Sequence, residues 1–214
     1  WKRRLASRLS ARYDRGMKFQ ETAIPGVMTI ELEPRGDERG FFARTFCERA
    51  FSEVGLQTRM VNTNMSYSRD KHTLRGMHWQ QAPSAEVKVV RCTKGRIFDV
   101  AVDIRPASAT FLEWVGAELS GENRRMLYVP EGFAHGFMTL EDHTEVSYQV
   151  SSFYDGERER GIRWDDSAVG IHWPVAPAVF QVTIGRQVVP AGRQRHQAAD
   201  VASSQFTHRL GGQH

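Results

Sequence analysis

The stretch RIFDVAVDI, residues 96–104, decides how this sequence folds. Side chains of an extended chain point to alternate faces, so residues two apart share a face. One face of this stretch carries the large apolar side chains Phe98, Val100, Val102 and Ile104. The other face carries Asp99, Ala101 and Asp103. This alternation predicts a β-strand with an apolar side and a side that bears carboxylates.

Similar short runs extend from residue 24 to about residue 182, and glycine and proline turns separate them. The clearest are residues 27–32, 88–92, 125–129 and 144–150. A single clear helical candidate spans residues 48–54 and ends at Gly55. Many short strands with such turns are typical of a sandwich or jelly roll, so we predict an all-β fold with short helices. A polar interior is indicated by the strand residues Lys88, Asp99, Asp103 and Tyr148.

The 214 residues are enough for one domain with a sizeable core. We expect this domain to span residues 17–184, because Met17-Lys18-Phe19 is a natural translation start. Residues 1–16 are then an upstream or added extension, and we expect it to be poorly ordered. Residues 185–214 are rich in Gln, Ala, Ser and His, which predicts a second poorly ordered tail.

The positive charge of the chain lies in its two ends. The net charge is +4, but residues 1–16 alone carry +5 and residues 185–214 carry +3. The body between them is therefore mildly acidic. A nucleic-acid-binding surface needs a basic patch, so we expect no nucleic-acid partner for the folded domain.

The sequence carries no sign of membrane insertion or export. No apolar run approaches the roughly 18 residues of a membrane-spanning helix, and none follows the basic N-terminal residues as in a secretory signal. Cys47 and Cys92 are the only cysteines, and two distant cysteines are neither a disulfide framework nor a metal site. We therefore expect a cytoplasmic protein with no membrane partner.

Two histidines lie beside glycines in runs of strand-like sequence. LRGMH ends at His78, and PEGFAHGF, residues 130–137, contains His135. Histidine titrates near neutral pH. Together with Lys88 and Tyr148 on neighbouring strands, it would supply a base, a cation and a phenol. This set suits proton abstraction next to a carbonyl, without a metal or redox cofactor.

The run around His135 is also half of a metal-binding signature, Pro-x-Gly-x-x-His. The other half would need a second histidine two residues after His78, where this chain has Gln80. Metals need three or four ligands on converging strands, so we expect no bound metal.

Other polar and aromatic residues allow either a structural or a functional interpretation. Arg39 and Arg75 lie beside glycines, and with Lys88 they would suit the capture of phosphate oxygens. Tyr154, near other aromatic residues, either packs in the core or offers a stacking surface. We assign the tryptophans Trp114, Trp164 and Trp173 to the core.

Several motifs in one order make the chain resemble the dTDP-4-dehydrorhamnose 3,5-epimerase family over roughly residues 18–180. They are GDERGFF (36–42), LRGMH (74–78), Lys88, FDVAVDIR (98–105), PEGFAHGF (130–137), Tyr148 and GIRWDD (161–166). The resemblance implies a cupin-type jelly roll without metal or other cofactor, usually a homodimer. It implies an isomerase that epimerises a nucleotide-linked 4-keto-6-deoxyhexose at C3, C5 or both through an enolate, as in dTDP-L-rhamnose biosynthesis.

The resemblance also implies a role for each matching residue. His78 matches the general base, Tyr148 the general acid, and Lys88 the lysine near the C4 oxygen. The remaining matches are the substrate-binding residues Arg75 and His135, the nucleotide or phosphate contacts Arg39, Asn64 and Glu159, and the base-stacking Tyr154.

The sequence departs from the family at three places. Arg44 stands where members often carry a glutamate that contacts the base, and residues 62–64 read Asn-Thr-Asn instead of Gln-Asp-Asn. Gly185-Arg186 occupies the positions of a Lys-Asp pair whose aspartate orients the histidine. Asp99 is then a candidate to orient His78. These departures allow a second hypothesis. The chain is then a divergent member of the family that binds the sugar nucleotide without catalysis or inverts a single centre.

Overall fold

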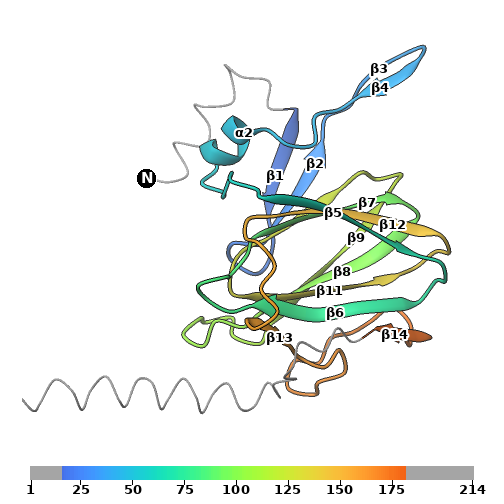
Figure 1. The fold of residues 1–214 in the computed structure, drawn as a ribbon. Coiled ribbons are helices and arrows are strands. Elements are labelled where there is room, and N and C mark those ends of the chain that lie inside the picture. The colour runs from blue at the N-terminus through green and yellow to red at the C-terminus, as the bar shows by residue number, and fades with distance from the viewer. Residues whose placement is uncertain (1–15, 182–214) are drawn as a thin grey trace, which may run out of the picture.

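The computed structural model describes residues 16–181, and Figure 1 shows them as two layers of β-sheet. The prediction of an all-β fold is confirmed, with one short helix in this part of the chain. No helix between residues 16 and 181 is long and apolar enough to cross a membrane. The expected extension, apart from Gly16, the expected tail and the domain end at residue 184 lie outside the described residues.

The two layers are six-stranded sheets, antiparallel except at one pair. The first contains, in spatial order, β1 (Met17–Glu21), β2 (Met28–Leu32), β10 (Met126–Val129), β7 (Lys88–Lys94), β12 (Thr144–Val150) and β5 (Asn62–Ser68). The second contains β13 (Glu159–Gly161), β6 (Thr73–Gln80), β11 (Phe133–Thr139), β8 (Arg96–Asp103) and β9 (Trp114–Ser120), with β14 (Val179–Gln181) parallel to β6. Consecutive strands often lie in different sheets, which is the crossing pattern of a jelly roll.

Two smaller elements lie outside these sheets. β3 (Arg35–Asp37) and β4 (Gly40–Phe42) form a hairpin that projects from the body (Figure 1). The helix α2 (Glu48–Glu53) agrees with the helix predicted over residues 48–54. Its Phe51 is fully buried and packs with Ile30 and Met126 on the outer face of the first sheet.

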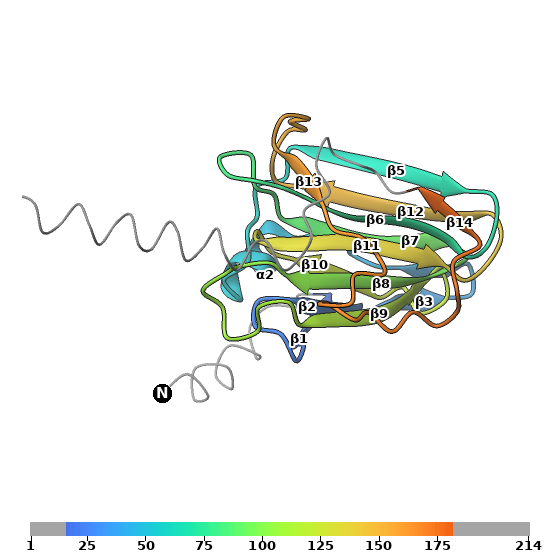
Figure 2. The same cartoon turned by 90° about the horizontal axis from the view of Figure 1, so that it is seen from below.

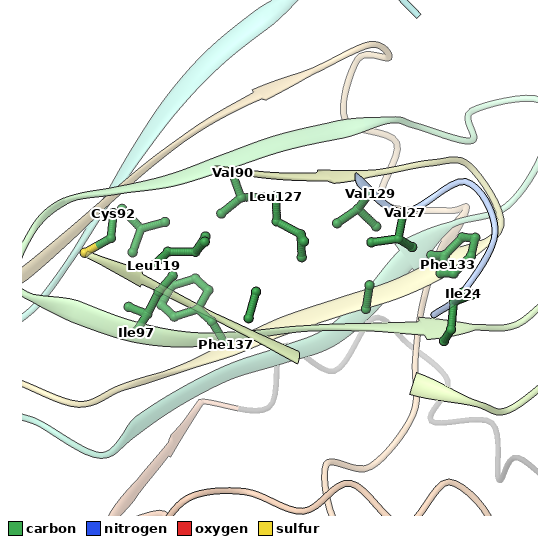
Figure 3. Packing of buried hydrophobic residues seen from close by; sticks show 13 residues of the cluster. Ile24, Val27, Val90, Cys92, Ile97, Leu119, Leu127, Val129, Phe133 and Phe137 are labelled. Atoms are coloured by element: carbon green, nitrogen blue, oxygen red, sulfur yellow. The ribbon is translucent and has the colours of Figure 1, made fainter. Parts of the chain in front are cut away.

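Apolar side chains from both sheets meet between the layers, as Figure 3 shows. Val90, Leu127 and Val146 come from the first sheet, and Ile97 and Phe137 come from the second. Burial of this apolar area, at roughly 25 cal/mol per Å², holds the two layers together.

The large apolar face of β8 points away from this interior. It packs instead with Ile162, Val169 and Trp173 of the chain that follows β13. Figure 2 shows this chain crossing the outer side of the second sheet. The alternation read from residues 96–104 is therefore correct, and both faces of the strand are buried.

Asp103 does not contribute to a polar interior, contrary to the expectation. It lies at the end of β8 and accepts hydrogen bonds from Arg105 Nε at 2.9 Å, Ser108 Oγ at 2.6 Å and Thr110 Oγ1 at 2.7 Å. Burial has the largest single effect and raises the pKa of the Asp103 carboxyl, but the hydrogen bonds together outweigh it and lower the pKa to about 2. The carboxylate thus fixes the loop after β8.

The two glycine-flanked histidines lie on neighbouring strands. His135 of β11 pairs with His78 of β6, and the register shifts just after His135. Gly76 has a φ of +113°, and a Cβ there would lie 2.5 Å from the Cα of Gly136. A Cβ on Gly136 would lie 2.7 Å from the carbonyl oxygen of Arg75. Glycine at both positions therefore permits the close backbone approach that sets the two histidines on one wall.

Gly136→Ala is expected to lower the free energy of unfolding by about 1–3 kcal/mol, because the added methyl group overlaps backbone atoms. Urea unfolding measures the change. Gly36→Ala is the matched control, since its Cβ would meet only the carbonyl oxygen of Gly40, at 3.4 Å. The control should stay within about 0.5 kcal/mol of the parent. Equal losses in the two variants would contradict this account of the glycines.

Candidate active site

A cavity of about 300 Å³ lies between the two sheets. Strands β5, β7 and β12 line it from the first sheet, and β6, β11 and β13 line it from the second. The structure brings together eight residues that the sequence analysis singled out, namely Asn64, Arg75, His78, Lys88, His135, Tyr148, Tyr154 and Glu159.

His78 and Lys88 contact each other in the cavity lining. Lys88 Nζ lies 2.8 Å from His78 Nε2. An ammonium group only donates hydrogen bonds, so Nε2 accepts and the ring proton is on Nδ1. Within the described residues, Nδ1 is buried and no hydrogen bond reaches it.

The surroundings of His78 disfavour its protonation. The charge of Lys88 has the largest effect, followed by burial and then by the charge of His135, and together they hold the pKa of His78 well below the ordinary value of histidine. At neutral pH the imidazole is therefore neutral. A neutral imidazole has a lone pair, here on Nε2, that is able to take a proton once the hydrogen bond from Lys88 is released.

Lys88 is itself buried, with 4% of its surface exposed. Burial lowers the pKa of its ammonium group, and the negative charge of Glu86 acts in the opposite direction. Glu86 Oε1 lies 3.3 Å from Lys88 Nζ. The cavity floor thus contains a chain of three polar groups, from the Glu86 carboxylate through the ammonium to the imidazole.

The prediction for Asp99 is not met by this geometry. The buried carboxylate of Asp99 accepts a hydrogen bond from His135 Nε2 at 2.8 Å and has no hydrogen bond with His78 in the described structure. The register explains this, because Phe137 of β11, two residues from His135, pairs directly with Asp99 of β8. Asp99 therefore fixes the ring of His135. The rings of His78 and His135 lie 6.3 Å apart, centroid to centroid.

Tyr148 lines the cavity from the opposite sheet to His78. It lies on β12, between β7 and β5, and is half-buried. Burial has the largest effect on the phenol and raises its pKa above the ordinary value. The phenol therefore keeps its proton at neutral pH and is able to donate it. The imidazole and the phenol face one cavity from two different sheets.

The cavity lining also contains a half-buried arginine and an exposed aromatic ring. Arg75 donates hydrogen bonds to Ser68 Oγ at 3.1 Å and to the carbonyl oxygen of Tyr67 at 3.0 Å. Tyr154 is 71% exposed, and its hydroxyl donates to Glu159 Oε2 at 2.8 Å. This bond holds the ring at the mouth of the cavity with a face open to solvent.

Some predicted residues lie elsewhere. Arg39 is exposed on the β3–β4 hairpin, pairs with Asp37 at 2.6 Å and does not line the cavity. Arg44 lies between β4 and α2 and is not among the lining residues either. Gly185-Arg186 is outside the described residues.

Seven lining residues were not predicted to belong to the site. They are Asn62, Ser66, Gln80, Glu86, Phe137, Val150 and Ser152. Each lies two positions from a predicted site residue, so the period of an extended chain would have identified them.

Between residues 16 and 181, no three His, Cys, Asp or Glu side chains are grouped to hold a metal ion.

The chain is similar to curated epimerases over most of their length. The family model described as dTDP-4-dehydrorhamnose 3,5-epimerase matches residues 21–191. The dTDP-4-dehydrorhamnose 3,5-epimerase of Shigella flexneri is 49% identical over 160 residues, which cover 74% of this chain and 88% of that protein. The Escherichia coli K12 protein of the same name is 44% identical over 159 residues, 74% of this chain and 85% of its own.

Solved structures agree with these matches. The dTDP-6-deoxy-D-glucose-3,5-epimerase of Legionella pneumophila, in complex with dTDP-4-keto-L-rhamnose, is 40% identical, with a TM-score of 0.73 over 78% of this chain and 88% of that one. A 4-keto-6-deoxy sugar epimerase from the novobiocin gene cluster of Streptomyces spheroides is 31% identical, with a TM-score of 0.78 over 88% of this chain and 96% of that one. The chain therefore belongs to the dTDP-4-dehydrorhamnose 3,5-epimerase family.

Proposed function

We propose that this chain epimerises a nucleotide-linked 4-keto-6-deoxyhexose at C3, C5 or both, with dTDP as the nucleotide. The observation that carries the proposal is the pair of His78 and Tyr148, which line one cavity from opposite sheets. Inversion of a carbon requires that a proton leave from one face and return to the other. A base and an acid on opposing walls meet this requirement.

The ketone at C4 makes the C–H bonds at C3 and C5 acidic. His78 Nε2 takes the proton, and the electron pair of the broken C–H bond forms an enolate. Lys88 donates a hydrogen bond to the enolate oxygen, where the negative charge develops. Tyr148 then delivers its proton to the opposite face of the carbon, and solvent restores the proton of the phenol and removes the proton of the imidazole.

Substrate binding frees the base in this scheme. In the structure the Nε2 lone pair accepts a hydrogen bond from Lys88 Nζ at 2.8 Å. The C4 oxygen competes for that N–H, so a bound ketone takes the ammonium and leaves Nε2 available for the proton. His135, held by Asp99, is close enough to His78 to assist at the same oxygen.

The rim residues suit the nucleotide. Arg75 supplies a cation for a phosphate oxygen, and the exposed ring of Tyr154 supplies a surface on which a base stacks. Asn64 and Glu159 line the same cavity and add polar groups to it. The Legionella pneumophila neighbour, solved with dTDP-4-keto-L-rhamnose, supports this class of ligand.

We further propose a cytoplasmic homodimer. Phe41 and Phe42 on the projecting hairpin are 52% and 67% exposed, and adjacent exposed aromatic side chains are typical of an association surface. A hairpin that reaches a second copy would also carry Arg39 toward a cavity. Cys47 and Cys92 form no disulfide with each other, which suits a reducing compartment.

Incubation with dTDP-4-keto-6-deoxyglucose in heavy water tests the reaction. We expect deuterium at C3, C5 or both, identified by NMR and mass spectrometry, and the labelled positions report which centres react. His78→Ala should abolish exchange, while Tyr148→Phe should leave exchange and slow inversion by about 100-fold or more. His172→Ala and Tyr67→Phe are the matched controls. Absence of exchange in the parent protein would overturn the proposal in favour of a binding protein.

The titration of His78 is expected to depend on Lys88. Because Lys88 lowers the pKa of His78, Lys88→Met should raise the midpoint of His78, measured by NMR of the imidazole Cε1–H, with His78→Ala to identify the signal. The unfolded chain binds this proton near pH 6.5, so the parent should lose stability as the pH falls below about 6.5. An unchanged midpoint in Lys88→Met would show that the lysine charge does not reach the ring.

Phe41→Ser with Phe42→Ser is expected to produce a folded monomer, because the exposed apolar surface of the hairpin is lost. Sedimentation velocity at micromolar concentration measures the state of both proteins. Val175→Ser, which removes another exposed apolar side chain, is the control and should remain dimeric. A monomeric parent protein would contradict the dimer.

A further inference from the structure

Glu86 is a largely buried carboxylate in the cavity lining, just before β7, for which the reaction described above has no role. Its side chain is 11% exposed, and that of Lys88 is 5% exposed. The two side chains form an ion pair at 3.3 Å between Oε1 and Nζ. Both residues line the cavity, and Lys88 Nζ also contacts His78 Nε2. Glu86 therefore acts on the imidazole only through the lysine.

A buried ammonium group without a counter-charge tends to lose its proton, because the charged form has lost its hydration. A neutral amine would donate more weakly to an enolate oxygen. It would also have a lone pair of its own and would no longer be restricted to donating to His78. The scheme above therefore depends on Lys88 remaining charged in a site where burial opposes its charge.

Several other ionisable groups act on Lys88 or line the same cavity from the surrounding strands. They are His78 on β6, Asp99 on β8, His135 on β11, Tyr148 on β12 and Glu159 on β13. Asp99 and Glu159 favour the charged lysine, but Asp99 is bonded to His135 and Glu159 to Tyr154. Among the described residues, Glu86 is the carboxylate that pairs with Lys88 directly.

We propose that Glu86 is a positioning residue that holds Lys88 as an ammonium ion aimed at His78 Nε2. In this role it keeps the base unprotonated before the substrate binds and keeps a full cation ready for the C4 oxygen afterwards. The role in turnover rests on the proposed epimerisation. The charge coupling between Glu86 and Lys88 rests on the ion pair alone.

Two readouts in Glu86→Gln test the inference. The first is the NMR titration of the lysine side chains, which is tractable because the chain has only five lysines, and Lys88→Arg identifies the signal. The second is the pH profile of kcat/KM with dTDP-4-keto-6-deoxyglucose. Glutamine keeps the size of the side chain and removes its charge. Glu21→Gln, the same change at an exposed position on β1, is the matched control.

Removing the carboxylate lets burial lower the pKa of Lys88 further. We therefore expect the Lys88 midpoint and the alkaline limb of kcat/KM in Glu86→Gln to move to lower pH together, by about one pH unit or more. Activity on the acid side of that limb should be nearly retained, and above it kcat should fall more than KM rises. Glu86→Asp, whose carboxylate lies further from Nζ, should give a smaller shift in the same direction. Glu21→Gln should match the parent in both readouts.

A Lys88 midpoint in Glu86→Gln that coincides with that of the parent would overturn the inference. If the midpoint falls while the alkaline limb does not move, the ion pair exists but does not position the lysine for catalysis, which also overturns it. If the parent shows no turnover, the proposed function fails, and the midpoint alone then decides the charge coupling. Should Glu86→Gln not fold by circular dichroism, Glu86→Asp provides the same test with the smaller shift.

Discussion

A buried ammonium group in contact with an imidazole is the constraint on which this site depends. Lys88 Nζ and His78 Nε2 lie 2.8 Å apart where water has little access. The charge keeps the ring free of a proton, and the contact fixes which ring nitrogen carries the lone pair. Such an arrangement is costly to bury, and the ion pair of Lys88 with Glu86 offsets part of that cost.

The two sheets line the cavity from opposite sides and contribute different reactive groups to it. The second sheet contributes the two histidines, and the first contributes the lysine and the tyrosine. The glycines of β6 and β11 serve this arrangement, because they let the histidine strands pair without side chains between them. Asp99, behind His135, fixes one ring, while Lys88 fixes the other.

Local patterns in the sequence predicted much of this. The alternation of residues 96–104 and the helix near residue 48 depend on neighbours in the chain, and both occur as expected. The partner of Asp99 depends on the register between distant strands, which no local pattern contains. The direction in which the hairpin with Arg39 projects is likewise not contained in its local sequence. Glu86 lies two residues before Lys88, so the alternation of an extended chain places it on the same face. It belongs to no motif that indicates a functional role.

The strands that carry the reactive groups lie inside the sheets. β6 pairs with β11, β13 and β14, β11 lies between β6 and β8, and β7 and β12 each have a neighbour on both sides. Their amide hydrogens are locked in ladders that open only when a large part of the domain unfolds, so they should be among the slowest in the molecule to exchange with solvent. The spacing of base, cation and phenol is therefore a property of the folded scaffold. A ligand adapts to that spacing and does not create it.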